Sequence, residues 1–196
     1  MKKRWVLNKA ADFEVVNNLA QALYVDHSIA MLLVQRGIYT YEDAREFFRP
    51  DLSRLHDPYL MKDMDRAVDR IEKALHDAEK ILVYGDYDVD GTTAVALVYT
   101  FLKQFSDRVD YYIPDRYSEG YGVSIQGIDY AAENGFKLVI ALDCGIKAIE
   151  KIKYARERGV DFIIGDHHRP DDSLPPAAAV LMKRLSEASR FQYPVE

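Results

Sequence analysis

One stretch, residues 81–93, constrains the fold of this chain more than any other. A short aliphatic run, Ile81–Val83, precedes aspartates at alternate positions, a glycine and two threonines. The residues of this acidic segment are Asp86, Asp88, Asp90 and Gly91. The segment that follows, 94–99, is too apolar to face water. We therefore predict a buried strand, an acidic loop and a buried helix, in that order.

Two further aliphatic runs end in polar side chains of the same kind. Residues 138–142 lead into Asp143, and residues 162–165 lead into Asp166, His167 and His168. Because the carboxyl ends of parallel strands meet at one edge of a sheet, these side chains are expected to gather there. Crowded carboxylates repel one another unless a cation lies among them, and hard divalent ions prefer oxygen ligands. The pattern predicts a divalent metal site.

The alternation of apolar runs predicts the fold class. Further strands are expected at 109–113 and 177–181, and amphipathic helices at 65–79, 94–104, 124–134 and 146–158. Strands that alternate with helices in this way indicate βαβ units with right-handed crossovers. The prediction is an α/β fold: a mostly parallel sheet of about five strands flanked by helices.

Residues 1–62 are expected to form a helical N-terminal extension, before a core at 63–181 and a tail at 182–196. Apolar residues recur at helical spacing over 13–23. Asp26 suits the cap of a second helix, and Thr40 with Asp43 resembles a capping box for a third. No catalytic constellation is found in this extension.

Composition sets only broad limits. The chain has 196 residues, 48% of them hydrophobic, and no apolar run long enough to span a membrane. Its one cysteine, Cys144, forbids an internal disulfide and fits a reducing cytoplasm. The net charge of −6 neither excludes nor favours a polyphosphate ligand, because the aspartates of the predicted site carry most of it and bound cations would reverse the local sign.

Simpler interpretations of these motifs were weighed. An EF-hand loop also begins with alternating aspartates, but it needs a glutamate at its twelfth position, where this chain has Leu97. A solvated acidic turn does not explain the two other acidic strand ends. Cys144 is most simply a small buried residue. Arg116 follows the second strand, where it suits phosphate recognition, although a surface arginine explains it equally well.

The motifs, taken together and in this order, resemble those of the DHH phosphoesterase superfamily. They are Asp86-Tyr87-Asp88-Val89-Asp90-Gly91, Asp143-Cys144-Gly145 and Asp166-His167-His168. The longer stretch 83–91, with Glu119–Gly122 and 143–146, is similar to the RecJ branch of that superfamily. Segments 33–37 and 55–58 extend the similarity, which covers roughly residues 4 to 181.

The resemblance implies an exonuclease specific for single-stranded DNA, which works from the 5′ end and depends on Mn²⁺ or Mg²⁺, with two ions expected. It implies that the metal ligands are Asp88, Asp90, Asp143 and His167, with Asp86 as a further one. His168 would contact the scissile phosphate, beside Asp166 as a metal ligand or as the group that orients a ring. Arg116 would hold a substrate phosphate, and Gly91 is expected at the substrate as well.

The chain departs from the family pattern in its last part. A later motif with another metal-binding aspartate, and the second domain that completes the DNA cleft, are not found. An incomplete site, in a fragment, is therefore expected. Two alternatives stay open: a phosphodiesterase or pyrophosphatase for small substrates, and a non-catalytic nucleic-acid-binding module. Small-substrate members typically have a histidine where this chain has Tyr84.

Overall fold

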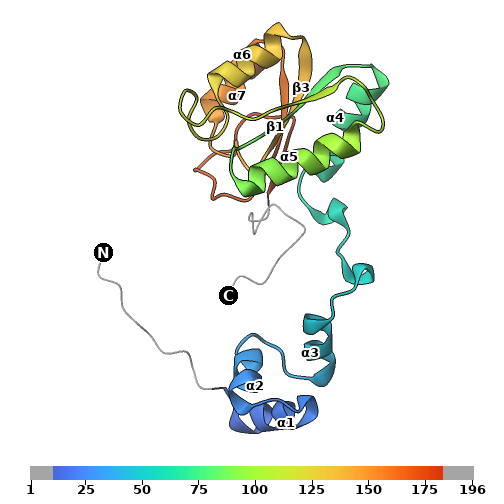
Figure 1. The fold of residues 1–196 in the computed structure, drawn as a ribbon, viewed down its shortest axis with the longest axis vertical. Coiled ribbons are helices and arrows are strands. Elements are labelled where there is room, and N and C mark those ends of the chain that lie inside the picture. The colour runs from blue at the N-terminus through green and yellow to red at the C-terminus, as the bar shows by residue number, and fades with distance from the viewer. Residues whose placement is uncertain (1–10, 183–196) are drawn as a thin grey trace, which may run out of the picture. The chain divides into compact units, whose positions relative to one another are not determined.

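The structure, a computed structural model, describes residues 11–182 (Figure 1). Contacts divide the chain into two compact units, residues 1–56 and 57–196. Residues 183–196, which hold nearly all of the predicted tail, lie outside the described part. Among the described residues, no helix combines the length and the hydropathy that a membrane span requires.

The first unit is helical, as predicted. It contains α1 (Phe13–Leu23), α2 (His27–Val34), α3 (Tyr41–Phe48) and a 3₁₀ turn, η1 (Leu52–Arg54). Asp26 caps α2 through the backbone N–H of Ser28, and Thr40 and Asp43 form the predicted capping box on α3. The core of the unit is formed by the buried side chains of Val16, Leu19, Ala20, Ala30, Leu33, Val34, Ile38 and Ala44.

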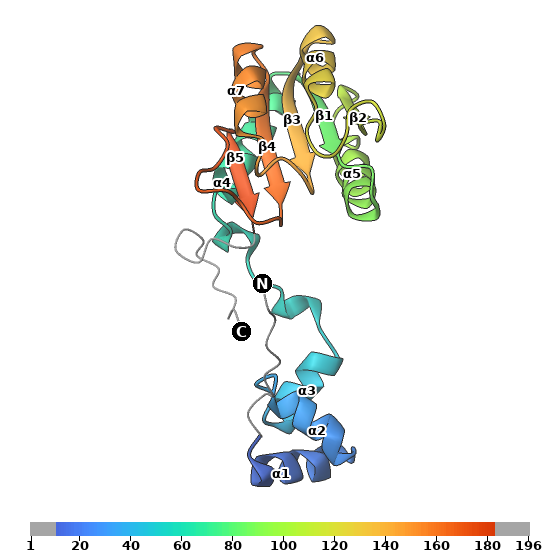
Figure 2. The same cartoon turned by 90° about the vertical axis from the view of Figure 1, so that its left-hand side faces the viewer.

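The second unit is built on a parallel sheet of five strands, which confirms the predicted fold class (Figure 2). Its strands are β1 (Lys80–Gly85), β2 (Val109–Tyr112), β3 (Phe136–Leu142), β4 (Asp161–Asp166) and β5 (Ala179–Met182). Their spatial order is β2-β1-β3-β4-β5, and every pairing is parallel. All carboxyl ends therefore lie at one edge of the sheet.

Helices cover both faces of this sheet (Figure 1). They are α4 (Met64–His76), α5 (Val89–Leu102), α6 (Ile125–Glu133) and α7 (Ile149–Glu157), after a 3₁₀ turn, η2 (Pro58–Leu60). Strand side chains alternate between the faces. Ile81 and Val83 pack in the cluster under α4 and α5, whereas Leu82 and Tyr84 pack in the cluster under α6 and α7. Both clusters are buried, so the sheet is covered on each side.

Two details differ from the sequence-based expectations. The helix expected from residue 146 begins at Ile149: Gly145 has a positive φ of 104°, and the backbone N–H of Ile146, in the loop after it, donates to Asp166 Oδ2 (3.0 Å). The helix expected to be buried, α5, is covered on one side only: within the described residues, Leu97 is 71% and Phe101 is 56% exposed. Its inner face supplies Val95 and Leu102 to the core.

Two glycines let α5 approach β1 more closely than other residues would allow. A Cβ atom built on Gly91 would lie 2.5 Å from the backbone oxygen of Asp86, and one on Gly85 would lie 2.4 Å from Val95 Cγ2. Both distances are far inside van der Waals contact. The first turn of α5 therefore rests directly on the backbone at the end of β1.

We predict that Gly91→Ala lowers the free energy of unfolding by about 1–3 kcal/mol, because the added methyl group would collide with backbone rather than with a flexible side chain. Gly165→Ala is the matched control, since a Cβ there would meet Leu142 at an ordinary 3.5 Å. Urea unfolding of the two variants measures the difference. Equal destabilisation would contradict the close packing.

Candidate metal site

The predicted site residues lie where β1 and β3 end side by side. The connection from β1 runs through α5 to β2, whereas the connection from β3 runs through α7 to β4 on the other face of the sheet. Neighbouring strands whose connections diverge leave a crevice at their carboxyl ends, which is the usual ligand position in open α/β sheets. Asp86 follows β1, and Asp143 follows β3.

The loop after β1 holds three aspartates in three different environments. Asp86 is fully buried; its Oδ1 accepts from the backbone N–H of Tyr87 (2.7 Å), and its Oδ2 has no hydrogen-bond partner among the described residues. Asp88 caps α5 by accepting from the N–H of Gly91 (3.0 Å). Asp90 is exposed in the first turn of the helix. A buried carboxylate oxygen without a donor is costly unless a cation satisfies it, so this loop fits a divalent ion.

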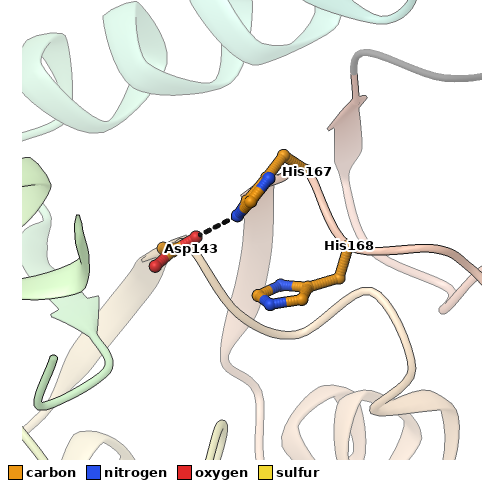
Figure 3. Close-up of side chains that lie close together, drawn as sticks. All are labelled: Asp143, His167 and His168. Carbon is orange, nitrogen blue, oxygen red and sulfur yellow. Dashed lines mark ion pairs between the residues drawn. The ribbon is translucent and has the colours of Figure 1, made fainter.

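Asp143 sits at the end of β3 in a left-handed backbone conformation, with φ at 59°. Its side chain is 9% exposed, and its Oδ1 lies 3.0 Å from His167 Nε2 (Figure 3). Burial raises the pKa of this carboxyl, and the nearby charges of Asp88 and Asp90 raise it further, while His167 opposes them. Asp88 and Asp90 are thus close enough to act on Asp143, which joins the loop after β1 to the end of β3.

His167 and His168 complete a compact set of donors with Asp143. One ligand atom from each of these side chains lies within 4.8 Å of the others. In Figure 3 the ring of His167 points at Asp143, and the ring of His168 lies beside it. A carboxylate and neutral imidazoles at this separation suit a first-row divalent ion. The three residues come from the ends of β3 and β4, as the sequence predicts.

Asp166 is already fully engaged by the protein. Its Oδ1 accepts from the backbone N–H of His168 (2.9 Å) and lies 2.7 Å from Nδ1 of the same residue, while its Oδ2 accepts from the N–H of Ile146. The side chain is 1% exposed. Asp166 therefore fixes the ring of His168, in the manner of carboxylates that orient histidines at metal sites. If Nδ1 carries the proton, Nε2 is the free acceptor of a neutral ring.

Tyr121 faces that acceptor and was not singled out by sequence reasoning. Its hydroxyl lies 3.2 Å from His168 Nε2. Burial raises the pKa of Tyr121 to about 12, and Asp86, Asp143 and Asp88 contribute. The hydroxyl is therefore protonated at neutral pH, and it donates to Nε2 when Nδ1 carries the proton of the ring. The segment Glu119–Gly122 carries the family resemblance, so a signal was present in the sequence without a role attached to it.

Arg116 is linked to the site by contacts between aromatic rings. Its guanidinium lies 5.3 Å from the ring centroid of Tyr87, the residue directly after Asp86. Tyr87 in turn contacts Tyr121 edge-on, with centroids 6.2 Å apart. Arg116 is exposed, so its guanidinium is open to a ligand. The amide of Gly91, by contrast, already donates to Asp88.

A buried polar network holds the loop that carries Arg116 and Tyr121. The hydroxyl of Tyr84 donates to the carbonyl of Gly122 (3.0 Å) and accepts from the N–H of Ser124 (3.1 Å). Glu119 accepts from the hydroxyls of Tyr112 (2.9 Å) and Ser124 (2.5 Å). Sequence reasoning missed Glu119 and Ser124 as positioning residues, because their partners lie on other elements. The network ties this loop to β1 and β2.

The fold and these strand-end side chains define an α/β domain with carboxylates and histidines gathered at a switch point of the sheet. Residues 80–190 match the DHH family, N-terminal domain, and the chain belongs to this family. The expected similarity to RecJ is also confirmed. The chain is 42% identical over 180 residues to the single-stranded-DNA-specific exonuclease RecJ of Bacillus subtilis (strain 168), covering 92% of this chain and 23% of that protein.

Solved structures agree with this assignment. RecJ in complex with Mn²⁺ from Thermus thermophilus superimposes with a TM-score of 0.69 at 27% identity, over 91% of this chain and 24% of that one. A crystal structure of exonuclease RecJ bound to manganese gives 0.58 at 34% identity, over 62% of this chain and 31% of that one. The chain thus spans about a quarter of the length of the curated relative it matches.

We predict that Mn²⁺ stabilises this chain and that Asp143→Asn removes most of the effect. An ion at 100 times its dissociation constant adds about 2.7 kcal/mol to the free energy of unfolding. Because the pKa of Asp143 is raised, its negative charge destabilises the metal-free fold at neutral pH. This loss of stability shrinks as the pH falls below the raised pKa, and it is gone below the ordinary pKa of an aspartate. Metal-free Asp143→Asn should therefore melt no lower than the parent.

Thermal melts with and without Mn²⁺ test this, with Asp107→Asn, an exposed aspartate outside the site, as the control. A full Mn²⁺ shift in Asp143→Asn would contradict the assignment.

We predict that Tyr84→Phe lowers the free energy of unfolding by about 1–3 kcal/mol, because the buried N–H of Ser124 and carbonyl of Gly122 lose their partner. Tyr154→Phe is the control, since its hydroxyl bonds Asp129 near the surface, where water replaces it. Chemical denaturation compares the two. An equal loss in both would mean that the Tyr84 hydroxyl does not hold the loop.

Proposed function

We propose that this chain carries the metal-binding part of a RecJ-like exonuclease, which hydrolyses phosphodiester bonds of single-stranded DNA from the 5′ end with Mn²⁺ or Mg²⁺. The observation that supports this most is the convergence of Asp143, His167 and His168 beside the aspartate loop after β1. Relatives described as single-stranded-DNA-specific exonucleases, and RecJ structures holding Mn²⁺, support the substrate and the metal.

Each residue has a role in this proposal. Asp88, Asp90, Asp143 and His167 would hold two divalent ions, and Asp86, whose Oδ2 has no hydrogen-bond partner among the described residues, would be a further ligand. When bound, such ions activate water and stabilise the charge that develops on a phosphoryl group. His168, with its ring fixed by Asp166, lies at the scissile phosphate, and the hydroxyl of Tyr121 supplies a proton donor beside it.

The remaining assignments concern the substrate and the organisation of the chain. Arg116 binds a substrate phosphate, and Gly91 lets the loop at the substrate pack closely on the end of β1, because a Cβ there would collide with the backbone of Asp86. Residues 63–181 form the DHH core, and residues 1–62 form its N-terminal extension. A cytoplasmic location is part of the proposal, on the strength of a single cysteine that is buried and unpaired.

The structure gives a reason to prefer this function over hydrolysis of small substrates. Small-substrate members of the superfamily typically carry a histidine where this chain has Tyr84. Tyr84 is 1% exposed, and its hydroxyl is engaged by Gly122 and Ser124. It is therefore unable to act as a metal ligand, and its position serves the loop instead.

We predict that Asp90→Asn lowers Mn²⁺-dependent hydrolysis by more than about 100-fold, because even partners outside the ligand set typically cost 10–100-fold. The assay follows mononucleotide release from 5′-labelled single-stranded DNA. Asp69→Asn, an exposed aspartate on α4, is the matched control and should retain the parent rate. Turnover by Asp90→Asn at the parent rate would overturn the metal assignment.

The same experiment separates the non-catalytic alternative. A parent chain that is stabilised by Mn²⁺ but releases no nucleotide would mean that residues 1–196 bind metal without cleaving DNA. Release by the parent, lost in Asp90→Asn, excludes that alternative.

A further inference from the structure

A cavity opens beside the metal cluster, on the side of His168 that faces α7. Its volume is about 910 Å³, and its walls come from three segments, 121–123, 144–151 and 166–169. Asp166 and His168 belong both to this wall and to the site described above. A phosphate bound at His168 would therefore have its attached groups at the mouth of the cavity.

The inner wall of the cavity is apolar and uncharged. Val123, Cys144 and Ile146 line it and are almost completely buried. Tyr121 stands at the mouth, in edge contact with the ring of His168. Apolar walls with an aromatic ring at the entrance are typical of sites that hold a flat aromatic ligand.

The rim is positive, although the whole chain is acidic. Lys147, Lys151 and Arg169 line the cavity, against the single exposed carboxylate of Glu150. Glu150 is itself paired with Lys153 (2.7 Å), which lies outside the lining. Lys147 lies 3.8 Å from Asp171, with both side chains more than half exposed, so this pair is weak. An anion attached to an aromatic group fits this distribution.

We propose that this cavity is the nucleoside subsite of the metal site: it takes the base and sugar of the nucleotide whose phosphate lies at His168. This inference rests on the function proposed above, and it adds where the substrate is held. Its volume lies in the range of about 300–1,000 Å³ that small-molecule sites occupy. The base stacks on Tyr121 and fills the apolar wall, while Lys147 and Arg169 offset the charge of adjoining phosphates. Because the wall offers few polar groups, recognition is expected to be tolerant of base identity.

Filling the cavity provides the test. Ala148 lines it and is followed directly by α7, so the series Ala148→Val, Ala148→Leu and Ala148→Phe reduces its volume stepwise. The probe is thymidine 5′-monophosphate with Mg²⁺, titrated by calorimetry and by amide chemical shifts. We expect affinity to fall along the series, by at least about 10-fold for Ala148→Phe, as for other steric changes in apolar pockets. Ala96→Phe, on the exposed side of α5, is the control and should bind as the parent does.

A second readout separates this inference from the proposed function. Thymidine 5′-(p-nitrophenyl phosphate) carries a nucleoside, and methyl p-nitrophenyl phosphate does not, so their ratio of kcat/KM with Mn²⁺ reports use of the subsite. Ala148→Phe should lose the preference for the thymidine ester while its rate on the methyl ester stays at the parent value.

Unchanged nucleotide affinity across the Ala148 series, or the absence of binding by the parent, overturns the subsite and leaves the metal site intact. Hydrolysis of neither ester by the parent overturns the proposed function for this chain, while the titration still decides the subsite. Ala148→Val and Ala148→Leu, together with melting temperatures, keep the result interpretable if the phenylalanine variant does not fold.

Discussion

The contact between Gly91 and the backbone of Asp86 is the constraint on which the site depends. It places the first turn of α5 directly on the end of β1, at a distance that admits no side chain. Because the loop between them is so short, Asp86 is forced inside with one oxygen unpaired, and Asp88 is turned back to cap the helix. Folding thus creates an electrostatic cost at this loop, of the kind that a bound cation would relieve.

The hydrogen bonds given to each carboxylate distinguish positioning residues from candidate ligands. Asp166 accepts from two backbone N–H groups and contacts the ring of His168, so its charge is satisfied by the protein. Asp143 is paired in the described part of the chain with the exposed His167, and burial together with the charge of Asp88 raises its pKa. The adjacent aspartates of the family motifs are therefore not equivalent. Asp166 fixes the geometry of its neighbours, whereas Asp143 has fewer hydrogen-bond donors in the described part of the chain.

Local pattern was enough to predict the strands and the edge at which their polar ends meet. Aliphatic runs such as 138–142 identify buried strands, and parallel pairing then follows from the intervening helices. Local pattern does not predict contacts between residues that are distant in sequence. The loop before α7 is held by a hydrogen bond between Ile146 and Asp166, 20 residues apart. The outer face of α5 is as apolar as its inner face, so composition did not indicate which side is packed in the described part of the chain.

Tyr84 connects these two levels, because it belongs to the core and to the site at once. Its ring stacks on Tyr112 beneath α6, and its hydroxyl bonds residues 38 to 40 positions later that hold the loop of Tyr121. A histidine at this position has no hydroxyl group. It would not bond the carbonyl of Gly122 and the N–H of Ser124 through one oxygen atom, as Tyr84 does. Replacing Tyr84 by histidine would therefore remove the hydrogen bonds that hold the loop of Tyr121, and would introduce an imidazole that can bind a metal ion. The loop in turn forms one wall of the cavity beside His168, so the choice at Tyr84 bears on the substrate as well as on the metal.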